Sequence, residues 1–285
     1  MADFGLSIGV QCAGGLRSTS VANQSTHDAW SAGGSYERYM GRWSREMAGR
    51  FLAWLGLPPA LDWVDIGCGT GALSSAILAE AAPRSLVGID PSEEFLQHAR
   101  TSNPDPRARF EAGNASSIPC PSESVDAAVS ALAYNFFPDR PAALAEMRRV
   151  SRPGATVAFY VWDYPGGGVG FISAFWRAAT ALDPAAADLA EGVRFPFCTA
   201  VSLAKELADA GLNDVEVHGI EYLAKFADFD DFWRPFTLGA GPAPGYYQSL
   251  NAERRQALES KLRSDLGGGP LEFVLRAWAA RGEAR

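Results

Sequence analysis

The feature that most constrains the fold is a set of three glycines at alternate positions, directly after an apolar segment. Residues 64–71 read VDIGCGTG, and a helix-prone run extends from Ala72 to Ala81. Glycine suits such a loop because the backbone must turn sharply and a ligand can approach the main chain where no Cβ intervenes. The order of strand, tight loop and helix therefore predicts a nucleotide-binding loop.

This loop does not by itself identify the nucleotide. The spacing Gly67-x-Gly69-x-x-Ala72 also satisfies the dinucleotide fingerprint. The next apolar run, residues 85–89, ends in Asp90, where an acid would bind ribose hydroxyls in either interpretation. Asp90 therefore predicts a bound ribose and leaves open whether it belongs to NAD(P) or to another nucleotide.

Further motifs, taken in order along the chain, resemble those of class I S-adenosylmethionine-dependent methyltransferases. The resemblance runs from about Tyr36 to the C-terminus, and the joint order is more specific than any single motif. The similar segments are DIGCGTG (65–71, first motif), GID (88–90, acidic second-strand motif), GNASSIP (113–119, adenine-contacting motif), SVDAAVSALAYNFFPD (124–139, fourth strand) and YMGRWS (39–44, the segment before the core in a small-molecule, type 11-like branch).

The resemblance implies S-adenosylmethionine as the cofactor and a set of residues that bind it. Main-chain N–H groups of the glycine loop would receive the methionine and ribose portion, Asp65 would organise the loop and the ligand's amino group, and Asp90 would accept from both ribose hydroxyls. The expected cofactor-binding residues are Tyr36, Arg42, Trp43, Asp65, Gly67, Cys68, Gly69, Gly71, Asp90, Pro91, Asn114, Ala115 and Ala131.

One expected adenine contact departs from the family pattern, which often has Asp at position 114. The amide oxygen of Asn114 can still accept from the adenine amine, but without charge assistance. We therefore expect a weaker adenine contact. After the fourth strand, Ala131 should lie under the cofactor, with Tyr134 and Asn135 facing the acceptor.

Strand and helix signals alternate along the chain as a doubly wound α/β fold requires. We predict a Rossmann-like, seven-stranded sheet with helical cap insertions, and the resembled family implies an antiparallel last strand. Asp139 should cap a helix with Pro141 in its first turn, and Gly211 should end a later helix. The expected strands lie near residues 62–66, 86–89, 108–111, 125–130, 156–161, 215–220 and 271–278.

The chain length suggests one elaborated domain with added segments. We expect residues 1–28 to be a disordered arm, residues 29–58 a helical cap segment and residues 59–285 the methyltransferase core. Insertions at about 164–198 and 223–268 should enclose the substrate, because long insertions in compact domains are often lids or binding loops and the second is rich in aromatic residues.

Composition favours a cytoplasmic enzyme with a small-molecule acceptor. The formal charge of −8 argues against nucleic acid, whose binding needs clustered Lys and Arg. Four cysteines, Cys12, Cys68, Cys120 and Cys198, lack C-x-x-C spacing, which is typical of a reducing compartment and predicts no metal site. No apolar run approaches the ~20 residues of a membrane helix. The sequence does not indicate an oligomeric state.

Methyl transfer is an in-line displacement in which the protein supplies orientation and excludes water. Transfer to oxygen or carbon usually needs a base, but His27, His98 and His218 occupy unsuitable positions, and Asn135 stands where many relatives have histidine. An amine, thiol or carboxylate acceptor would need no base. The remaining catalytic candidates are Asn135, Asp163, Tyr164, Asp231, Tyr246 and Tyr247.

Two alternatives stay open at this point. A nicotinamide-dependent oxidoreductase is supported by the dinucleotide spacing alone, and the GNA pattern at residues 113–115 counts against it. The other is a non-catalytic, S-adenosylmethionine-binding regulatory protein.

Overall fold

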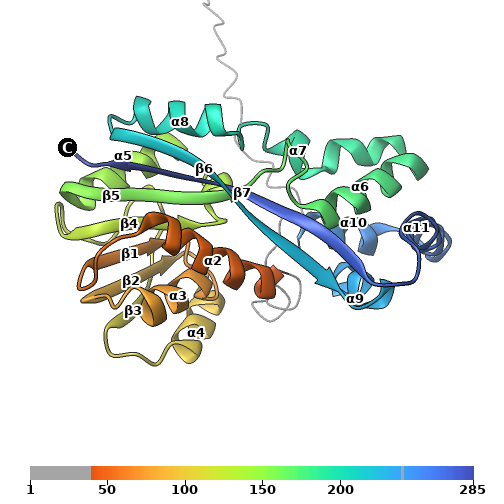
Figure 1. The fold of residues 1–285 in the computed structure, drawn as a ribbon, viewed down its shortest axis with the longest axis horizontal. Helices are drawn as coiled ribbons and strands as arrows, with labels where there is room; N and C mark the ends of the chain where they lie inside the picture. Colours follow the sequence, from red (N-terminus) through yellow and green to blue (C-terminus); the bar gives the residue numbers. More distant parts are fainter. Residues whose placement is uncertain (1–39, 239–240) are drawn as a thin grey trace, which may run out of the picture.

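Seven strands form one sheet in the computed structural model, which describes residues 40–238 and 241–285. Their order is β3-β2-β1-β4-β5-β7-β6 (Figure 1). β1 to β5 pair in parallel, and β7 lies antiparallel between β5 and β6. This arrangement confirms the expected fold, including the antiparallel last strand. The bounds are β1 Asp62–Ile66, β2 Ser85–Asp90, β3 Ala108–Ala112, β4 Val125–Ala131, β5 Ser151–Trp162, β6 Asn213–Phe226 and β7 Leu271–Glu283.

Helices cover both faces of this sheet because successive strand residues point to opposite sides. Trp63 and Tyr160 belong to a core with α2 (Arg42–Leu55) and α3 (Ala72–Glu80), whereas their neighbours Val64 and Phe159 belong to a second core. The second core is built with α5 (Arg140–Val150) and α8 (Ala200–Asp209). At the sheet edge, α4 (Glu93–Ser102) packs on β2 and β3.

Local sequence signals explain where α5 begins and where α8 ends. The Asp139 side chain accepts a hydrogen bond from the Ala142 N–H at 2.9 Å, and Pro141 lies in the first turn of α5. Gly211 follows the end of α8 with a φ of +78°, a conformation that favours glycine. The structure confirms both predicted helix boundaries.

The carboxyl end of β6 and the amino end of β7 project together from the main sheet, and a group of helices surrounds them (Figure 1). Aromatic rings fill this helical group, including Phe175 and Phe236, whose ring centroids lie 4.7 Å apart in a stacked arrangement. β6 continues to Phe226, so the connection to β7 begins after that residue. The helices are α6 (Gly170–Leu182), η4 (Pro184–Leu189), α7 (Glu191–Arg194), α9 (Phe229–Trp233), η5 (Arg234–Leu238), α10 (Pro242–Ser249) and α11 (Ala252–Leu266).

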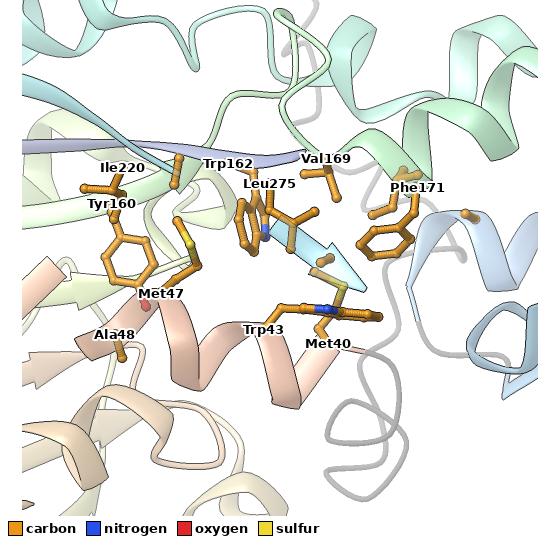
Figure 2. Packing of buried hydrophobic residues seen from close by; sticks show 14 of the residues in the cluster. Met40, Trp43, Met47, Ala48, Tyr160, Trp162, Val169, Phe171, Ile220 and Leu275 are labelled. Atoms are coloured by element: carbon orange, nitrogen blue, oxygen red, sulfur yellow. The ribbon is translucent and has the colours of Figure 1, made fainter. Parts of the chain in front are cut away.

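α2 joins the sheet to this helical group. Figure 2 shows Trp43 on α2 beside Phe171, and the two ring centroids are 4.6 Å apart. Met47, one turn further along the same helix, is fully buried between α2 and the sheet. The expected arm, residues 1–28, and the first part of the expected cap segment lie outside the described residues.

Candidate functional site

A cavity of about 690 Å³ lies at the carboxyl ends of β1, β2, β3 and β4. In a parallel α/β sheet this is the edge where ligands bind. The cavity is lined by residues 67–70, 72–73, 90–92, 95, 113–116, 131–133 and 136–138, together with Ser44 from α2 and Tyr160 from β5.

The glycine loop forms the floor of this cavity in a left-handed conformation. Gly67, Gly69 and Gly71 have φ values of +69°, +53° and +90°. A Cβ on Gly67 would lie 2.7 Å from the Ala133 Cβ, whereas a Cβ on Gly69 would meet no atom within 4 Å. Gly67 therefore permits close packing of two loops, and Gly69 leaves the main chain accessible to a ligand.

Asp90 stands at the end of β2, beside the glycine loop. Its side chain accepts from the Gly69 N–H at 3.0 Å and from the Ser92 N–H at 2.9 Å, one bond to each carboxylate oxygen. Burial raises the pKa of Asp90 above its ordinary value. Each oxygen retains a further lone pair, so the carboxylate can still accept from a diol such as that of a ribose.

Asp65 lies beneath the loop and is fully buried. Its Oδ2 accepts from the Ser74 hydroxyl at 2.7 Å, and its Oδ1 has no hydrogen-bond partner among the described residues. Burial raises the pKa of Asp65 to about 7. A buried polar atom without a partner is costly, and the expected contact of Asp65 with the ligand's amino group stays a prediction.

The loop after β3 borders the cavity with polar groups. Asn114 is exposed, and its side-chain oxygen accepts from the Ser116 N–H at 3.0 Å, an Asx turn. Ala115 behind it is buried. Asn114 therefore shapes its own turn, and its oxygen retains one lone pair for an adenine amine.

The cavity brings together most of the predicted cofactor-binding residues, and their roles stay predictions. Those that line it are Gly67, Cys68, Gly69, Asp90, Pro91, Asn114, Ala115 and Ala131. Trp43 instead packs in the core beside Phe171, and Arg42 pairs with Asp231 at 3.5 Å. Asp65 and Gly71 lie behind the lining. Tyr36 lies outside the described residues.

None of the catalytic candidates is among the residues that line this cavity, although Asn135 stands between the lining residues Ala133 and Phe136. Asp163 is buried just after β5. Its carboxylate accepts from the Gly166 N–H at 3.0 Å within the same loop, and from the Arg276 Nε at 2.7 Å, a bond that ties this loop to β7. Asn135 is buried, with an amide nitrogen that has no partner among the described residues. Tyr164, Asp231, Tyr246 and Tyr247 also lie outside the lining. Catalytic roles for these residues stay predictions.

Tyr134 differs from the expectation that it faces the acceptor. It is fully buried, its ring stacks on Phe159 at a centroid distance of 3.9 Å, and its hydroxyl donates to Glu206 at 2.5 Å. Burial, followed by this hydrogen bond, raises the pKa of Tyr134. Packing on the sheet and a satisfied hydroxyl explain why the ring turns away from the cavity.

Several lining residues were not assigned individually from the sequence. Phe136 ends the short 3-10 helix η3 (Tyr134–Phe136) in the connection after β4, and Phe137 follows it. Leu132, at the start of this connection, has a φ of +55°. This conformation is strained for leucine, and such strain is concentrated at functional sites. The adjacent aromatic pair after a strand was the one signal that could have identified this wall.

No group of three or more His, Cys, Asp or Glu side chains could hold a metal ion in residues 40–238 and 241–285. No helix of this described part is long and apolar enough to cross a membrane.

Comparisons with known proteins agree with this geometry. Residues 64–159 match the family model described as a methyltransferase domain. The malonyl-[acyl-carrier protein] O-methyltransferase of Pectobacterium atrosepticum is 33% identical over 128 residues, which are 45% of this chain and 49% of that protein. The 2-methyl-6-phytyl-1,4-hydroquinone methyltransferase of Synechocystis is 32% identical over 108 residues, 38% of this chain and 34% of that protein.

The fold has relatives among solved structures. A candidate methyltransferase from Bacillus halodurans superposes with a TM-score of 0.55 at 15% identity, covering 84% of this chain and 98% of that one. The chain spans about half, or less, of the length of the two curated relatives described above. The family model agrees with three features of the structure: the open glycine loop, the acid at the end of β2 and the order of the sheet. The domain that contains residues 64–159 belongs to the class I S-adenosylmethionine-dependent methyltransferases.

Proposed function

We propose that this protein transfers a methyl group from S-adenosylmethionine to a small-molecule acceptor. The observation that carries the proposal is the hydrogen bond between Gly69 and Asp90, two residues that line the cavity. Gly69 exposes main chain to the cavity, and the carboxylate of Asp90 is held beside it by a 3.0 Å hydrogen bond. A nucleoside needs both features, an open main chain and a fixed acceptor for its ribose hydroxyls.

The protein's own residues would bind the cofactor, orient it toward the acceptor and exclude water from the site. When bound, S-adenosylmethionine would supply an electrophilic methyl group to a lone pair of the acceptor, and S-adenosylhomocysteine would be the leaving group. Asp90 fixes the ribose, and the side chains of Phe136 and Phe137 keep water from the transfer path. Orientation and exclusion of water are the main contributions that such a displacement requires from a protein.

A small molecule is the acceptor class that the charge and the cavity favour. The formal net charge of −8 opposes a phosphate backbone, and the cavity has the size of an ordinary small-molecule site. The names of the two curated relatives point to different acceptors, a malonyl group on acyl-carrier protein and a hydroquinone. A cytoplasmic location is part of the proposal and is supported by the free thiols of Cys68, Cys120 and Cys198.

The role of the two insertions as substrate enclosure also stays a proposal. No described residue of 164–198 or 223–268 lines the cavity. The first insertion contributes indirectly, because Phe195 packs edge-on against the lining residue Phe136 at a centroid distance of 5.2 Å. In the second insertion, Phe229 and Phe232 are buried in the core of the helical group.

Two measurements test the proposed function. Calorimetry with S-adenosylhomocysteine and with NADH should show binding of the first alone, and NADH binding would favour the oxidoreductase alternative. Labelled S-adenosylmethionine, incubated at a subsaturating concentration with the protein and a pool of small metabolites, should yield a labelled product that forms more slowly with Asp90→Ala. Tight binding of S-adenosylhomocysteine without any labelled product would favour the regulatory alternative.

A further inference from the structure

The cavity has two chemically different halves. The sheet order places β2 and β3 on one side of β1, and β4 and β5 on the other. The polar lining side chains Asp90, Ser92 and Asn114 lie at or after the ends of β2 and β3, where Phe95 is the one aromatic residue of the described lining. The described lining residues from the end of β4 to Pro138 are all apolar and include Phe136 and Phe137. The polar half suits the nucleoside, so the apolar half is the space left for the acceptor.

Each phenylalanine of the apolar wall, Phe136 and Phe137, has a neighbouring ring that fixes its position. Phe136 packs edge-on against Phe195, with an interplanar angle of 83°. Phe137 packs edge-on against Tyr134 at a centroid distance of 5.8 Å and an angle of 72°. Both rings are half-buried and line the cavity, so they present preformed aromatic surface to a ligand.

The loop that carries this wall is held at both ends by one carboxylate. Glu206 on α8 accepts from the Tyr134 hydroxyl, just before the phenylalanine pair. It also accepts from Arg140, just after the pair, at 3.1 Å from Nε and 3.0 Å from Nη2. Such a bidentate bond is geometrically restrictive. The wall is therefore positioned before any ligand arrives.

The charge of the cavity adds a second constraint on the acceptor. Asp90 is the one charged side chain among the described residues that line it. An anionic group placed against the phenylalanine pair would lose hydration and gain no cationic partner from these lining residues. A planar uncharged ring would instead bury apolar surface and make favourable ring contacts.

We propose that the acceptor is an uncharged small molecule with a planar aromatic ring, which packs on Phe136 and Phe137. This inference rests on the proposed function and adds the substrate class. It separates this protein's site from one built for a carboxylate or an acyl-carrier thioester.

Three probes of similar size test the inference on the full chain saturated with S-adenosylhomocysteine: 1-naphthol, 1-naphthoate and decahydro-1-naphthol. The first is neutral and planar, the second is planar and anionic, and the third is neutral and not planar. Calorimetry should show 1-naphthol binding at least about tenfold more tightly than 1-naphthoate and about two- to tenfold more tightly than decahydro-1-naphthol.

Variants locate the probe. Phe136→Leu and Phe137→Leu remove a ring and keep an apolar side chain, so each should weaken 1-naphthol binding about two- to tenfold. In Phe136→Leu the affinity for S-adenosylhomocysteine should stay within about twofold. Phe137 also lies beside Gly67 of the glycine loop, so in Phe137→Leu the loss of 1-naphthol affinity should exceed any loss of S-adenosylhomocysteine affinity. Phe273→Leu is the matched control, because Phe273 is also half-buried but packs on Phe226 at the far end of β7. It should change neither affinity.

The outcomes separate this inference from the function on which it rests. Equal or tighter binding of 1-naphthoate or decahydro-1-naphthol, no binding of 1-naphthol, or unchanged affinity in both leucine variants would overturn the acceptor class alone. A chain that fails to bind S-adenosylhomocysteine would overturn the proposed function and this inference together.

Discussion

The carboxylate of Asp90 accepts a hydrogen bond from the backbone N–H of Gly69 at 3.0 Å, across 21 residues of sequence. This bond fixes the acid at the end of β2 to the loop at the end of β1. The two features by which the chain would hold a nucleoside are therefore one connected unit, and a change in either should affect the other.

Replacing Asp90 should weaken cofactor binding more than replacing Asn114. A hydrogen bond to a charged group contributes ~1.5–3 kcal/mol, so Asp90→Ala should raise the S-adenosylhomocysteine dissociation constant roughly ten- to a hundredfold. Calorimetry measures the constant. Asp105→Ala is the control, since Asp105 bonds Arg107 away from the cavity. An unchanged constant in Asp90→Ala would remove this residue from the site.

Asn114 should contribute less to binding than Asp90. Its oxygen is neutral and already accepts from the Ser116 N–H, so Asn114→Ala should cost only ~0.5–1.5 kcal/mol of binding free energy. The same calorimetric titration gives the comparison. A loss larger than that of Asp90→Ala would reverse the proposed ranking of adenine and ribose contacts.

Two glycines of one loop should respond differently to alanine. Both have positive φ, so each substitution should cost roughly 1–2 kcal/mol of stability. Gly67→Ala should destabilise further, because its Cβ would lie 2.7 Å from the Ala133 Cβ, whereas Gly69→Ala meets open cavity and should chiefly reduce S-adenosylhomocysteine affinity. Urea unfolding and calorimetry separate the two effects. Equal stabilities for the two variants would contradict this assignment.

The buried Asp65 should make stability depend on pH. Its pKa is about 7 in the folded chain against an ordinary value of 3.8, so the folded state holds this proton more tightly than the unfolded state. Between about pH 4 and pH 7 the free energy of unfolding therefore loses this contribution as pH rises, and the loss is complete above about pH 7.

Asp65→Asn removes the titrating group and is close in shape. Without ligand, the stability of this variant relative to the unmodified chain should rise from pH 4.5 to pH 7.5. Urea unfolding at several pH values measures the difference. A difference that stays constant, or that falls with pH, would show that Asp65 is not protonated preferentially in the folded state.

Glu206 and Tyr134 should be energetically coupled. Glu206→Ala leaves the buried hydroxyl of Tyr134 and the guanidinium of Arg140 without their carboxylate, which should cost ~1–3 kcal/mol of stability. Tyr134→Phe should lower the stability less, because Glu206 loses the Tyr134 hydroxyl but keeps its ion pair with Arg140. In a double-mutant cycle the combined loss should fall short of the sum by ~0.5–3 kcal/mol. Strict additivity would argue against a shared network.

The central sheet and the polar half of the cavity could be predicted from short-range sequence signals. The alternation of strands and helices fixed the parallel part of the sheet, and β1 spans the expected residues, Asp62–Ile66. Gly69 and Asp90 were identifiable because each stands directly at the end of a strand. Parallel strands bring their carboxyl ends to one edge, so residues far apart in sequence meet there without further information.

Tertiary structure alone decided which partners Asp163 and Tyr134 have. Asp163 resembles a catalytic acid in sequence, yet the register of β7 brings it Arg276, 113 residues away, as an ionic partner. Tyr134 turned inward because Phe159 and Glu206 offered a stacking surface and an acceptor. The glycine loop was determined by its own backbone requirements, whereas these side chains were determined by partners that only the packing of distant elements could supply.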